Sequence, residues 1–265
     1  MSAGPLQRRE LIVAGVQRLG AYHVLRLADD GQHPLAGQFA MLAAGERWGG
    51  GQDERPFLSR ALSIARREDG HSLFLLEDVG PGTARLCAMR PGERVFSLGP
   101  LGTGFTEPAE GSRPILVGGG VGIAPLAILQ DQLPGTATAL LGFRGSAHAL
   151  GASLLRDAAV ATDDGSVGHR GTVSELLARE LEAARDATVY ACGPAGMLES
   201  VRTMCEGAGV PAQLALEAPM ACGFGACHGC VVPVRGGGYV RVCVDGPVID
   251  AALLERVDAH AGSPA

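Results

Sequence analysis

The sequence predicts a multi-domain chain: a small antiparallel β-barrel, then an α/β domain with a doubly wound parallel sheet, then a small cysteine-rich module. Three observations predict this order. Short apolar runs separated by turn residues extend to about residue 105, a rhythm typical of small barrels. Strand and helix patterns then alternate, which indicates a parallel sheet, and four cysteines gather near the end. We place the domains at 1–107, 108–215 and 216–265.

The barrel is predicted from apolar segments at close intervals. They occur at 11–14, 22–27, 38–42, 73–76 and 94–98. The segment 22–27 alternates apolar and polar residues, and turn residues separate the segments, which favours a small antiparallel barrel.

The second domain begins after a linker rich in proline, glycine and charge at 108–113. The pattern predicts a buried strand at 114–117, a glycine turn at 118–125 and a helix to residue 133. Further elements are expected at 137–141 (strand), 150–158 (helix), 173–184 (helix), 188–191 (strand) and 195–206 (helix). A ligand of such a sheet lies at the carboxyl ends of its strands. Two loops, 118–125 and 192–197, are expected there.

Composition and charge exclude several functions. The chain of 265 residues has 22 basic and 28 acidic residues, a net charge of −6, and lacks a basic stripe with interleaved aromatics. Nucleic-acid binding is therefore not expected. No apolar run approaches the roughly 18 residues of a membrane span, and the first ten residues lack the apolar centre of an export signal. We expect a cytoplasmic protein with no membrane attachment.

The cysteine-rich segment has the spacing C-x4-C-x2-C-x12-C, formed by Cys222, Cys227, Cys230 and Cys243. This spacing is how a chain wraps one plant-type [2Fe–2S] cluster. Glycines at 223, 225 and 229 let the loop curl with positive φ, so that backbone N–H groups face sulfur. The four cysteines are therefore the predicted metal ligands.

A structural zinc site is the alternative for these cysteines. Cys227 and Cys230 would suit tetrahedral zinc together with Cys243 and either Cys222 or His228. A disulfide framework is less consistent with the sequence, because seven cysteines is an odd number.

The glycine turn of the second domain holds Gly118, Gly119, Gly120 and Gly122. Such a turn lets a diphosphate approach the backbone, with the positive end of the following helix beside it. The pattern departs from the usual G-x-G-x-x-G fingerprint. Taken alone, it could equally be a tight strand-to-helix turn.

A barrel followed by a nucleotide domain with G-G-x-G-x-A-P, and later Cys192-Gly193-Pro194, resembles the ferredoxin–NADP reductase-like flavoenzymes. The resemblance implies FAD on the barrel and NAD(H) at the two loops. The family's Arg-x-x-Ser flavin motif is matched by Arg60, Ala61, Leu62 and Ser63. A competing register places it at 55–59. An arginine there would bond the flavin diphosphate, and a serine hydroxyl would donate to the ring.

The resemblance also implies flavin contacts after this motif. They fall on Leu75, Leu76 and Glu77 of the next strand and on a phosphate-cradling turn with Gly82 and Thr83. Two departures stand out. Relatives usually carry proline where Ala61 stands. They often carry an aromatic or basic residue at the positions of 75–77, beside the flavin.

The segment from Leu216 to Cys227, with the sequence around Cys243 to Val248, narrows the resemblance. It is similar to the electron-transfer subunit of the two-subunit, NAD-linked dihydroorotate dehydrogenases. That family implies FAD, a [2Fe–2S] cluster and NAD(H) as substrate, and an FMN-containing catalytic partner in a heterotetramer of two of each subunit. The implied role is electron transfer in pyrimidine (UMP) biosynthesis, with no catalytic side chain required on this subunit.

Two other interpretations stay open at the level of sequence. The same modules occur in the flavin subunit of a sulfide dehydrogenase, a hydrogenase or an NADH-dependent ferredoxin:NADP oxidoreductase. A non-enzymatic iron–sulfur carrier or regulator is a third possibility, although the glycine turn at 118–122 argues against a degenerate nucleotide domain.

Overall fold

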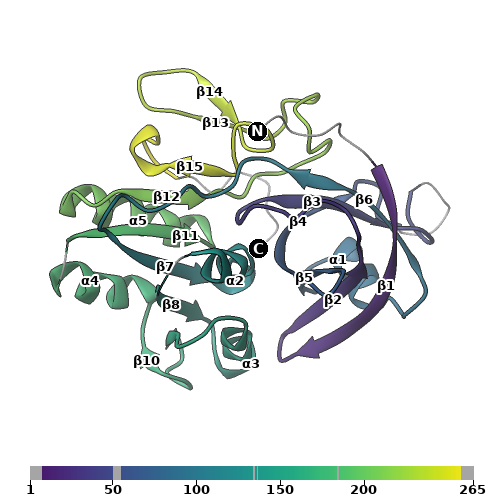
Figure 1. Ribbon diagram of the computed structural model, residues 1–265, viewed down its shortest axis with the longest axis horizontal. Helices are drawn as coiled ribbons and strands as arrows, with labels where there is room; N and C mark the ends of the chain where they lie inside the picture. The colour runs from purple at the N-terminus through teal and green to yellow at the C-terminus, as the bar shows by residue number, and fades with distance from the viewer. Residues whose placement is uncertain (1–7, 50–54, 134, 136, 184, 258–265) are drawn as a thin grey trace.

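The computed structural model describes residues 8–49, 55–133, 135, 137–183 and 185–257, and places a barrel beside an α/β sheet with a small module above both (Figure 1). The barrel is closed and antiparallel, in the order β1-β2-β5-β4-β3-β6. Its strands are β1 (Arg8–Leu19), β2 (Tyr22–Ala28), β3 (Phe39–Ala44), β4 (Arg60–Glu68), β5 (His71–Glu77) and β6 (Arg94–Leu101). A short helix, α1 (Pro81–Cys87), connects β5 to β6.

The inside of the barrel is filled by one apolar core. Leu25, Leu42, Phe74 and Val95 come from four different strands and are almost fully buried, and Leu86 of α1 joins them. Alternate residues of a strand face opposite sides, so one apolar set per strand closes the interior.

The second domain is a sheet in the order β10-β9-β8-β7-β11-β12-β15. Its parallel strands are β7 (Arg113–Gly119), β8 (Thr138–Phe143), β9 (Ala159–Thr162), β10 (His169–Arg170), β11 (Ala187–Cys192) and β12 (Ala212–Ala215). Strand order reverses between β7 and β11. This reversal is the switch point at which α/β sheets bind ligands, and it brings the loops after β7 and β11 together.

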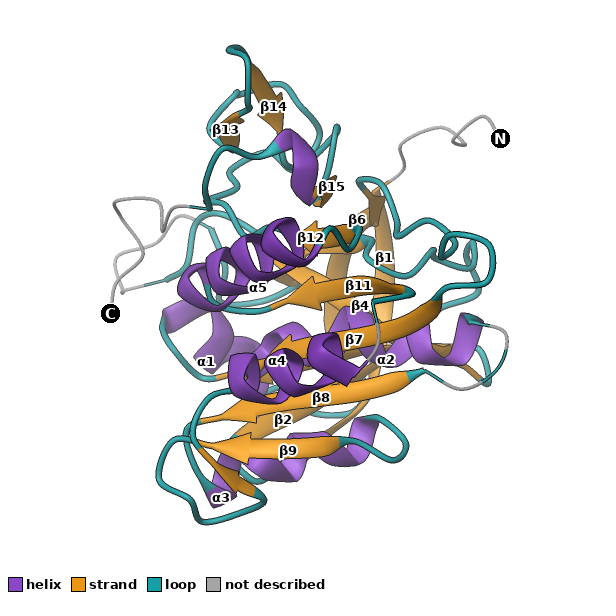
Figure 2. Ribbon diagram, turned by 90° about the vertical axis from the view of Figure 1, so that its left-hand side faces the viewer, coloured by secondary structure: helices purple, strands orange, loops and turns teal. Residues whose placement is uncertain are grey.

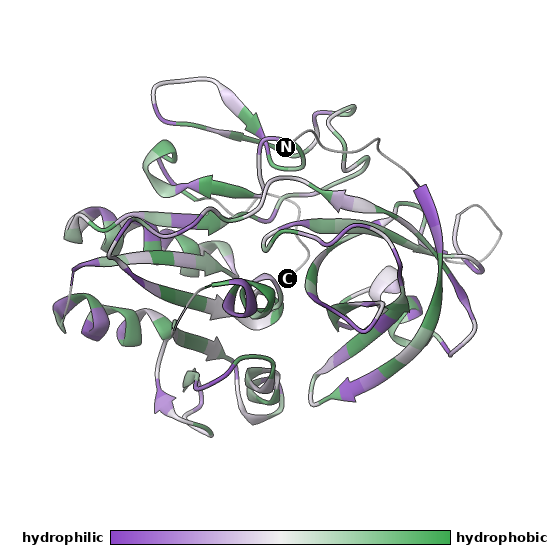
Figure 3. Cartoon of the chain, viewed as in Figure 1, coloured by the Kyte–Doolittle hydropathy of each residue, from purple (hydrophilic) through white to green (hydrophobic). Residues whose placement is uncertain are grey.

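Helices cover both faces of this sheet. The helices are α2 (Ala124–Gln132), α3 (Ser146–Ala149), α4 (Val173–Ala183) and α5 (Ala195–Ala208). Figure 2 shows α4 and α5 across one face, where they share a core with Ile115 and Val117. Leu116 points the other way and packs with α2. Both faces are covered, which explains why hydrophobic residues dominate the central strands (Figure 3).

The C-terminal module completes the sheet. Its hairpin, β13 (Val231–Pro233) and β14 (Tyr239–Arg241), is separate, but β15 (Val248–Asp250) pairs antiparallel with β12. A 3-10 turn, η3 (Ala251–Leu253), follows. The module is therefore continuous with the α/β domain in hydrogen bonding. The boundaries 1–107, 108–215 and 216–265 stay a prediction, and their ends at 1–7 and 258–265 lie outside the described residues.

Most predicted elements are confirmed, and one is wrong. The predicted helix at 150–158 is instead a 3-10 turn, η2 (Leu150–Leu154), followed by irregular chain up to β9, and α3 ends just before it. Gly151 lies against the ring of Tyr22. The chain therefore turns tightly at this close contact between domains instead of continuing as a helix. Among the described residues, no helix is both long and apolar enough to span a bilayer.

A buried ion network ties the barrel strands together. Asp29, which follows β2, is 7% exposed and contacts Arg9 of β1, Arg67 of β4 and Ser72 of β5. Burial alone would raise the pKa of this carboxyl, but hydrogen bonds from Arg9, Ser72 and the Gly31 backbone outweigh burial and lower its pKa to about 2.

We expect Asp29→Asn to lower the free energy of unfolding near neutral pH by about 3 kcal/mol, because it leaves two guanidinium groups without their carboxylate. The carboxylate stabilises the fold above its unfolded pKa, and this contribution is lost as pH falls through about 4 to about 2. The variant should therefore lose the acid sensitivity of the parent in that range. Denaturant unfolding at several pH values measures this, with Asp30→Asn, on an exposed neighbour, as the control.

Candidate cofactor sites

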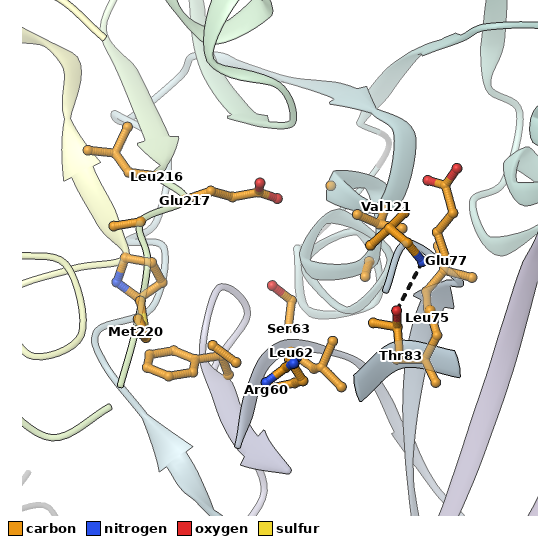
Figure 4. Close-up of a pocket in the computed structure, with 18 residues that line it drawn as sticks. Arg60, Leu62, Ser63, Leu75, Glu77, Thr83, Val121, Leu216, Glu217 and Met220 are labelled. Atoms are coloured by element: carbon orange, nitrogen blue, oxygen red, sulfur yellow. Dashed lines mark hydrogen bonds between the residues drawn. The ribbon is translucent and has the colours of Figure 1, made fainter. Parts of the chain in front are cut away.

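A cavity of about 300 Å³ lies between the barrel and the α/β sheet (Figure 4). Residues 60–63 of β4 and 75–77 of β5 form the barrel side, with Thr83 of α1. The 3-10 turn η1 (Gly120–Ile123) contributes Val121 and Gly122 from the sheet domain. The third wall is the segment 216–220, which leads into the cysteine module.

The cavity brings most of the predicted flavin residues to one place. Arg60, Ala61, Leu62, Ser63, Leu75, Leu76, Glu77 and Thr83 all line it. The described residues of the competing register, 55–59, are not among those that line it. Sequence analysis provides only the order of these residues along the chain. In the structure, two strands and one helix bring them to the same cavity.

Neighbouring groups hold the Arg60 guanidinium in place. Its Nη1 donates to the Leu58 carbonyl at 2.6 Å, and its guanidinium lies 5.7 Å from the centre of the Trp48 ring. A Cβ on Gly82 would stand 2.3 Å from Arg60 Nε. Gly82 therefore does not line the cavity but leaves room for the arginine that does.

The turn at 79–83 satisfies some of its own hydrogen-bond donors. Thr83 Oγ1 accepts from the Val79 and Gly80 N–H groups at 3.0 and 3.1 Å, and donates to the Gly80 carbonyl (Figure 4 marks the Val79 bond). These bonds fix the start of α1. A phosphate cradle at this turn stays a prediction, with fewer free N–H groups than a bare glycine turn would offer.

Glu77 connects the two domains at the edge of the cavity. Its Oε1 lies 3.2 Å from His148 Nε2 of α3 and 3.7 Å from Nη1 of Arg144, which follows β8. The pairing with His148 was missed from sequence, because no local pattern links a barrel strand to a helix 71 positions later.

The glycine loop after β7 is packed against the loop after β11. A Cβ on Gly122 would lie 2.5 Å from the Cys192 carbonyl oxygen, and one on Gly119 would lie 2.8 Å from the sulfur of Met197. A Cβ on Gly193 would approach the Gly119 nitrogen at 3.0 Å. At Gly122 and Gly193 a side chain would meet the backbone of the facing loop, and at Gly119 it would meet the side chains of Met197 and Pro194.

Gly120 differs from its neighbours. Its φ is +56° and no atom lies within 4 Å of the place that a Cβ would occupy, whereas Gly118 is crowded by Ile123, Leu126 and Leu141. Of the four predicted glycines, Gly120 is the one at which a diphosphate could approach without displacing protein. Gly118, Gly119, Cys192, Gly193 and Pro194 shape the loops without lining the cavity.

Two groups at this edge are shifted by burial. Burial raises the pKa of the Cys192 thiol far above its usual value, with a smaller contribution from the Glu217 carboxylate. The buried Cys192 thiol therefore stays protonated, and its contact with nicotinamide stays a prediction. Glu217 reaches toward the cavity opposite Ser63 (Figure 4). Its side chain is open to solvent on the cavity side and surrounded by protein elsewhere. This partial burial raises the pKa of the Glu217 carboxyl.

The four cysteines lie in one module with unequal exposure. Cys230 and Cys243 are each 2% exposed, Cys222 is partly buried and Cys227 is exposed. Backbone N–H groups face the sulfurs: Gly229 donates to Cys227 Sγ at 3.5 Å, and Cys243 N–H donates to Cys230 Sγ at 3.4 Å.

The loop curls largely as predicted. Gly223 and Gly225 have φ of +80° and +85°. The expectation for Gly229 is wrong: the third left-handed position is His228, with φ of +57°. Burial opposes ionisation of Cys222, but N–H groups of Phe224, Cys227 and Ala226 and the Cys227 thiol lower its pKa to about 6.

The four sulfurs are linked by their interactions: Cys222 with Cys227, Cys230 with Cys243, and Cys243 with Cys222. Within the described part of the chain, no three His, Cys, Asp or Glu side chains are arranged to hold one metal ion. The choice of a [2Fe–2S] centre over tetrahedral zinc therefore rests on the cysteine spacing, which is that of a plant-type [2Fe–2S] centre.

Comparison with known proteins agrees with this geometry. Residues 217–255 match the model of the iron–sulfur cluster binding domain of dihydroorotate dehydrogenase B. The electron transfer subunit of dihydroorotate dehydrogenase B (NAD(+)) from Desulforamulus reducens is 39% identical over 226 residues, which cover 81% of this chain and 84% of that protein. The subunit of the same name from Geobacillus thermodenitrificans is 38% identical over 208 residues, or 74% and 79% of the two chains.

The chain belongs to the family of dihydroorotate dehydrogenase B electron-transfer subunits. This membership confirms an oxidoreductase subunit that uses FAD, an iron–sulfur cluster and NAD(H), as the resemblance implied. It disfavours the sulfide dehydrogenase, hydrogenase and ferredoxin:NADP oxidoreductase alternatives. An electron-transfer subunit also implies a catalytic partner.

Solved structures confirm the fold of this family member. An NADH-dependent reduced ferredoxin–NADP oxidoreductase matches with a TM-score of 0.78 over 97% of this chain and 92% of that one, at 23% identity. The ferredoxin reductase of carbazole 1,9a-dioxygenase matches with a TM-score of 0.67 over 79% and 68%, at 24% identity. At these identities the likeness concerns architecture alone.

Sequence reasoning missed part of the cavity wall. Phe39, Val121, Leu216, Met220 and Pro247 also line it. The family pattern includes the segment from Leu216, and this was the only sequence signal that pointed to the segment as functional. Its position against the barrel depends on long-range packing that the pattern does not show.

Proposed function

We propose that this chain carries electrons between NAD(H) and an FMN-containing dihydroorotate dehydrogenase subunit, through FAD in the cavity and a [2Fe–2S] cluster on Cys222, Cys227, Cys230 and Cys243. The balanced reaction of the complex is dihydroorotate plus NAD⁺ giving orotate, NADH and H⁺. One observation carries the proposal above all: the cavity wall at 216–220 runs within two residues of Cys222. The two cofactor sites are therefore adjacent along the chain.

The residues of the cavity fit a flavin. About 300 Å³ is at the lower end of ligand pockets, which are mostly apolar with a few placed polar groups. Leu62, Leu75 and Leu76 supply the apolar wall, while Arg60 and Ser63 supply a cation and a hydroxyl. When bound, FAD exchanges a hydride with nicotinamide and single electrons with the cluster.

The roles of the individual side chains follow from their chemistry. Arg60 binds the diphosphate by charge-assisted hydrogen bonds. Ser63 donates a hydrogen bond to the ring system, and the leucine wall excludes water. The loops at 118–122 and 192–194 would hold NAD(H), and Gly122 of the first loop also lines the cavity, together with Glu217. No proton-transferring side chain of this subunit is required.

The outer face of the cysteine module is where we place the partner. Cys227 is exposed, and Phe224 and Tyr239 are exposed by 46% and 72%. Large apolar side chains gathered on a surface are typical of protein–protein contacts. We propose a heterotetramer with two copies of each subunit, acting in the cytoplasm in pyrimidine biosynthesis.

The test is to purify the tagged chain from its native host and identify what accompanies it. We expect an FMN-containing subunit in equal amount, a mass of four chains, and dihydroorotate-dependent reduction of NAD⁺ by the complex. The chain alone should reduce ferricyanide with NADH but leave dihydroorotate unchanged. A hydrogenase or sulfide dehydrogenase subunit as the stoichiometric partner, or dihydroorotate oxidation by the chain alone, would contradict the proposal.

A further inference from the structure

The loop that carries the first three cysteines, the cluster loop (222–230), rests directly on the barrel. At Gly223 an added Cβ would stand 2.5 Å from Cγ and 2.8 Å from Sδ of Met41, and 3.3 Å from Cδ1 of Leu101. Met41 lies on β3, is 3% exposed, and belongs to a packed core. Its Cγ is close to its own backbone, so the side chain cannot swing clear without changing its rotamer.

This contact joins the barrel to the cysteines through one apolar core. The outward-facing Phe39, Met41 and Leu101 of the barrel pack in the same cluster as Cys230 and Cys243. Phe39 also lines the cavity. The space between the proposed flavin site and the proposed cluster is therefore filled with packed side chains, with Met220 partly buried against the same core.

A second contact holds the other end of the module. Thr103, just after β6, donates its N–H to the Gly246 carbonyl at 2.5 Å and forms a bridge with Pro247. Pro247 lines the cavity. The module is thus fixed to the barrel on two sides, and the second contact includes a residue of the cavity wall.

We propose that the close approach of Gly223 to Met41 sets the position of the iron–sulfur cluster relative to the flavin cavity, which makes Gly223 and Met41 positioning residues for electron transfer. The inference rests on the proposed function, because it assumes both cofactors in their sites. Neither residue touches a substrate. Each acts by fixing where the cluster loop stands on the barrel.

Gly225 provides a matched control. It lies in the same loop with nearly the same φ, +85° against +80°, so alanine imposes similar backbone strain at either position. A Cβ on Gly225 would meet Val244 and Arg241. Both belong to the cysteine module itself, so Gly225→Ala strains the loop without pushing it off the barrel.

The experiment compares the parent, Gly223→Ala, Gly225→Ala, Met41→Ala and the double variant Met41→Ala/Gly223→Ala, each with its iron and FAD content measured. Stopped-flow absorbance follows reduction of the cluster by NADH, and ferricyanide reduction reports the flavin alone. We expect cluster reduction in Gly223→Ala to slow severalfold, because electron transfer becomes slower as the donor and the acceptor move apart. Ferricyanide reduction should stay at the parent rate.

Hydrogen exchange supplies a readout that does not depend on turnover. Peptides covering 218–230 should exchange faster in Gly223→Ala than in the parent, and the double variant should recover both the protection and most of the rate. Met41→Ala removes the Cγ and Sδ atoms that the new Cβ would meet, whereas it cannot relieve strain in the loop itself. Gly225→Ala strains the cluster loop without meeting Met41, so it measures how much of any slowing comes from strain in the loop alone.

The outcomes separate two failures. If Gly223→Ala and Gly225→Ala slow cluster reduction equally, or if Met41→Ala gives no recovery, the positioning role is wrong. If the parent protein itself lacks iron or FAD, the proposed function is wrong. A parent that reduces its cluster with NADH, together with a slow Gly223→Ala variant that Met41→Ala restores, supports the inference.

Discussion

Replacing Cys227 with alanine is expected to yield a folded flavoprotein without its iron–sulfur cluster. Cys227 is the exposed member of the four cysteines, so its truncation opens no hole in the core. Loss of one thiolate leaves an iron without a complete set of ligands. We therefore expect iron to fall from two atoms per chain to near zero, and dihydroorotate-linked reduction of NAD⁺ by the complex to fall to background.

The flavin should be unaffected by this change, because its predicted contacts lie on β4, β5 and α1. FAD content and NADH–ferricyanide activity of Cys227→Ala should match the parent. Metal analysis and the reduced-state EPR signal of anaerobically prepared protein are the measurements, and Cys87→Ala, in α1, is the control that should keep its iron. Stoichiometric zinc in the parent would contradict the two-iron assignment.

Replacing Arg60 with glutamine is expected to weaken FAD binding by about 10- to 150-fold. The guanidinium lines the cavity, and hydrogen bonds to a charged group contribute about 1.5–3 kcal/mol each. Burial lowers the pKa of Arg60 from 12.5 but leaves it charged near neutral pH. Glutamine keeps some length and polarity while removing the charge, so the loss reports on the diphosphate contact.

Titration of the apoprotein with FAD, followed by flavin fluorescence, measures this effect. The matched control is Arg55→Gln, which changes the arginine of the competing register and should bind FAD as the parent does. If Arg55→Gln were the weak binder and Arg60→Gln were normal, the motif would lie at 55–59 and the assignment of Arg60 and Ser63 would be wrong. The iron content of both variants should stay unchanged.

Much of the architecture follows from patterns that are local in sequence. Short apolar runs between turn residues mark the barrel strands, and the cysteine spacing marks the module matched by an iron–sulfur domain at 217–255. The glycine loop was also predicted, as a turn that a diphosphate approaches, but some of its glycines instead make room for a neighbouring loop. Gly119 and Gly122 meet the loop after β11, a contact that strand order creates and that no local pattern contains.

Most of the features that sequence analysis missed depend on chain segments that are distant in sequence, whereas the left-handed His228 in place of Gly229 is local to the cluster loop. The Glu77–His148 pair joins two domains, and the wall at 216–220 closes a cavity whose other sides are built by residues 60–83. The wrong helix at 150–158 has the same origin. Gly151 fits beneath Tyr22 of the barrel, and this tertiary contact overrides an apolar pattern that resembles a helix.

The pairing of β15 with β12 has a consequence for how such a subunit can be divided. A reductase made by stopping before residue 216 would expose the hydrogen-bonding edge of β12, a template on which another copy could add a strand. The C-terminal segment thus doubles as a cover for that edge. For this reason the C-terminal module cannot be exchanged freely between reductases, even though its cysteine loop is continuous in sequence and looks self-contained.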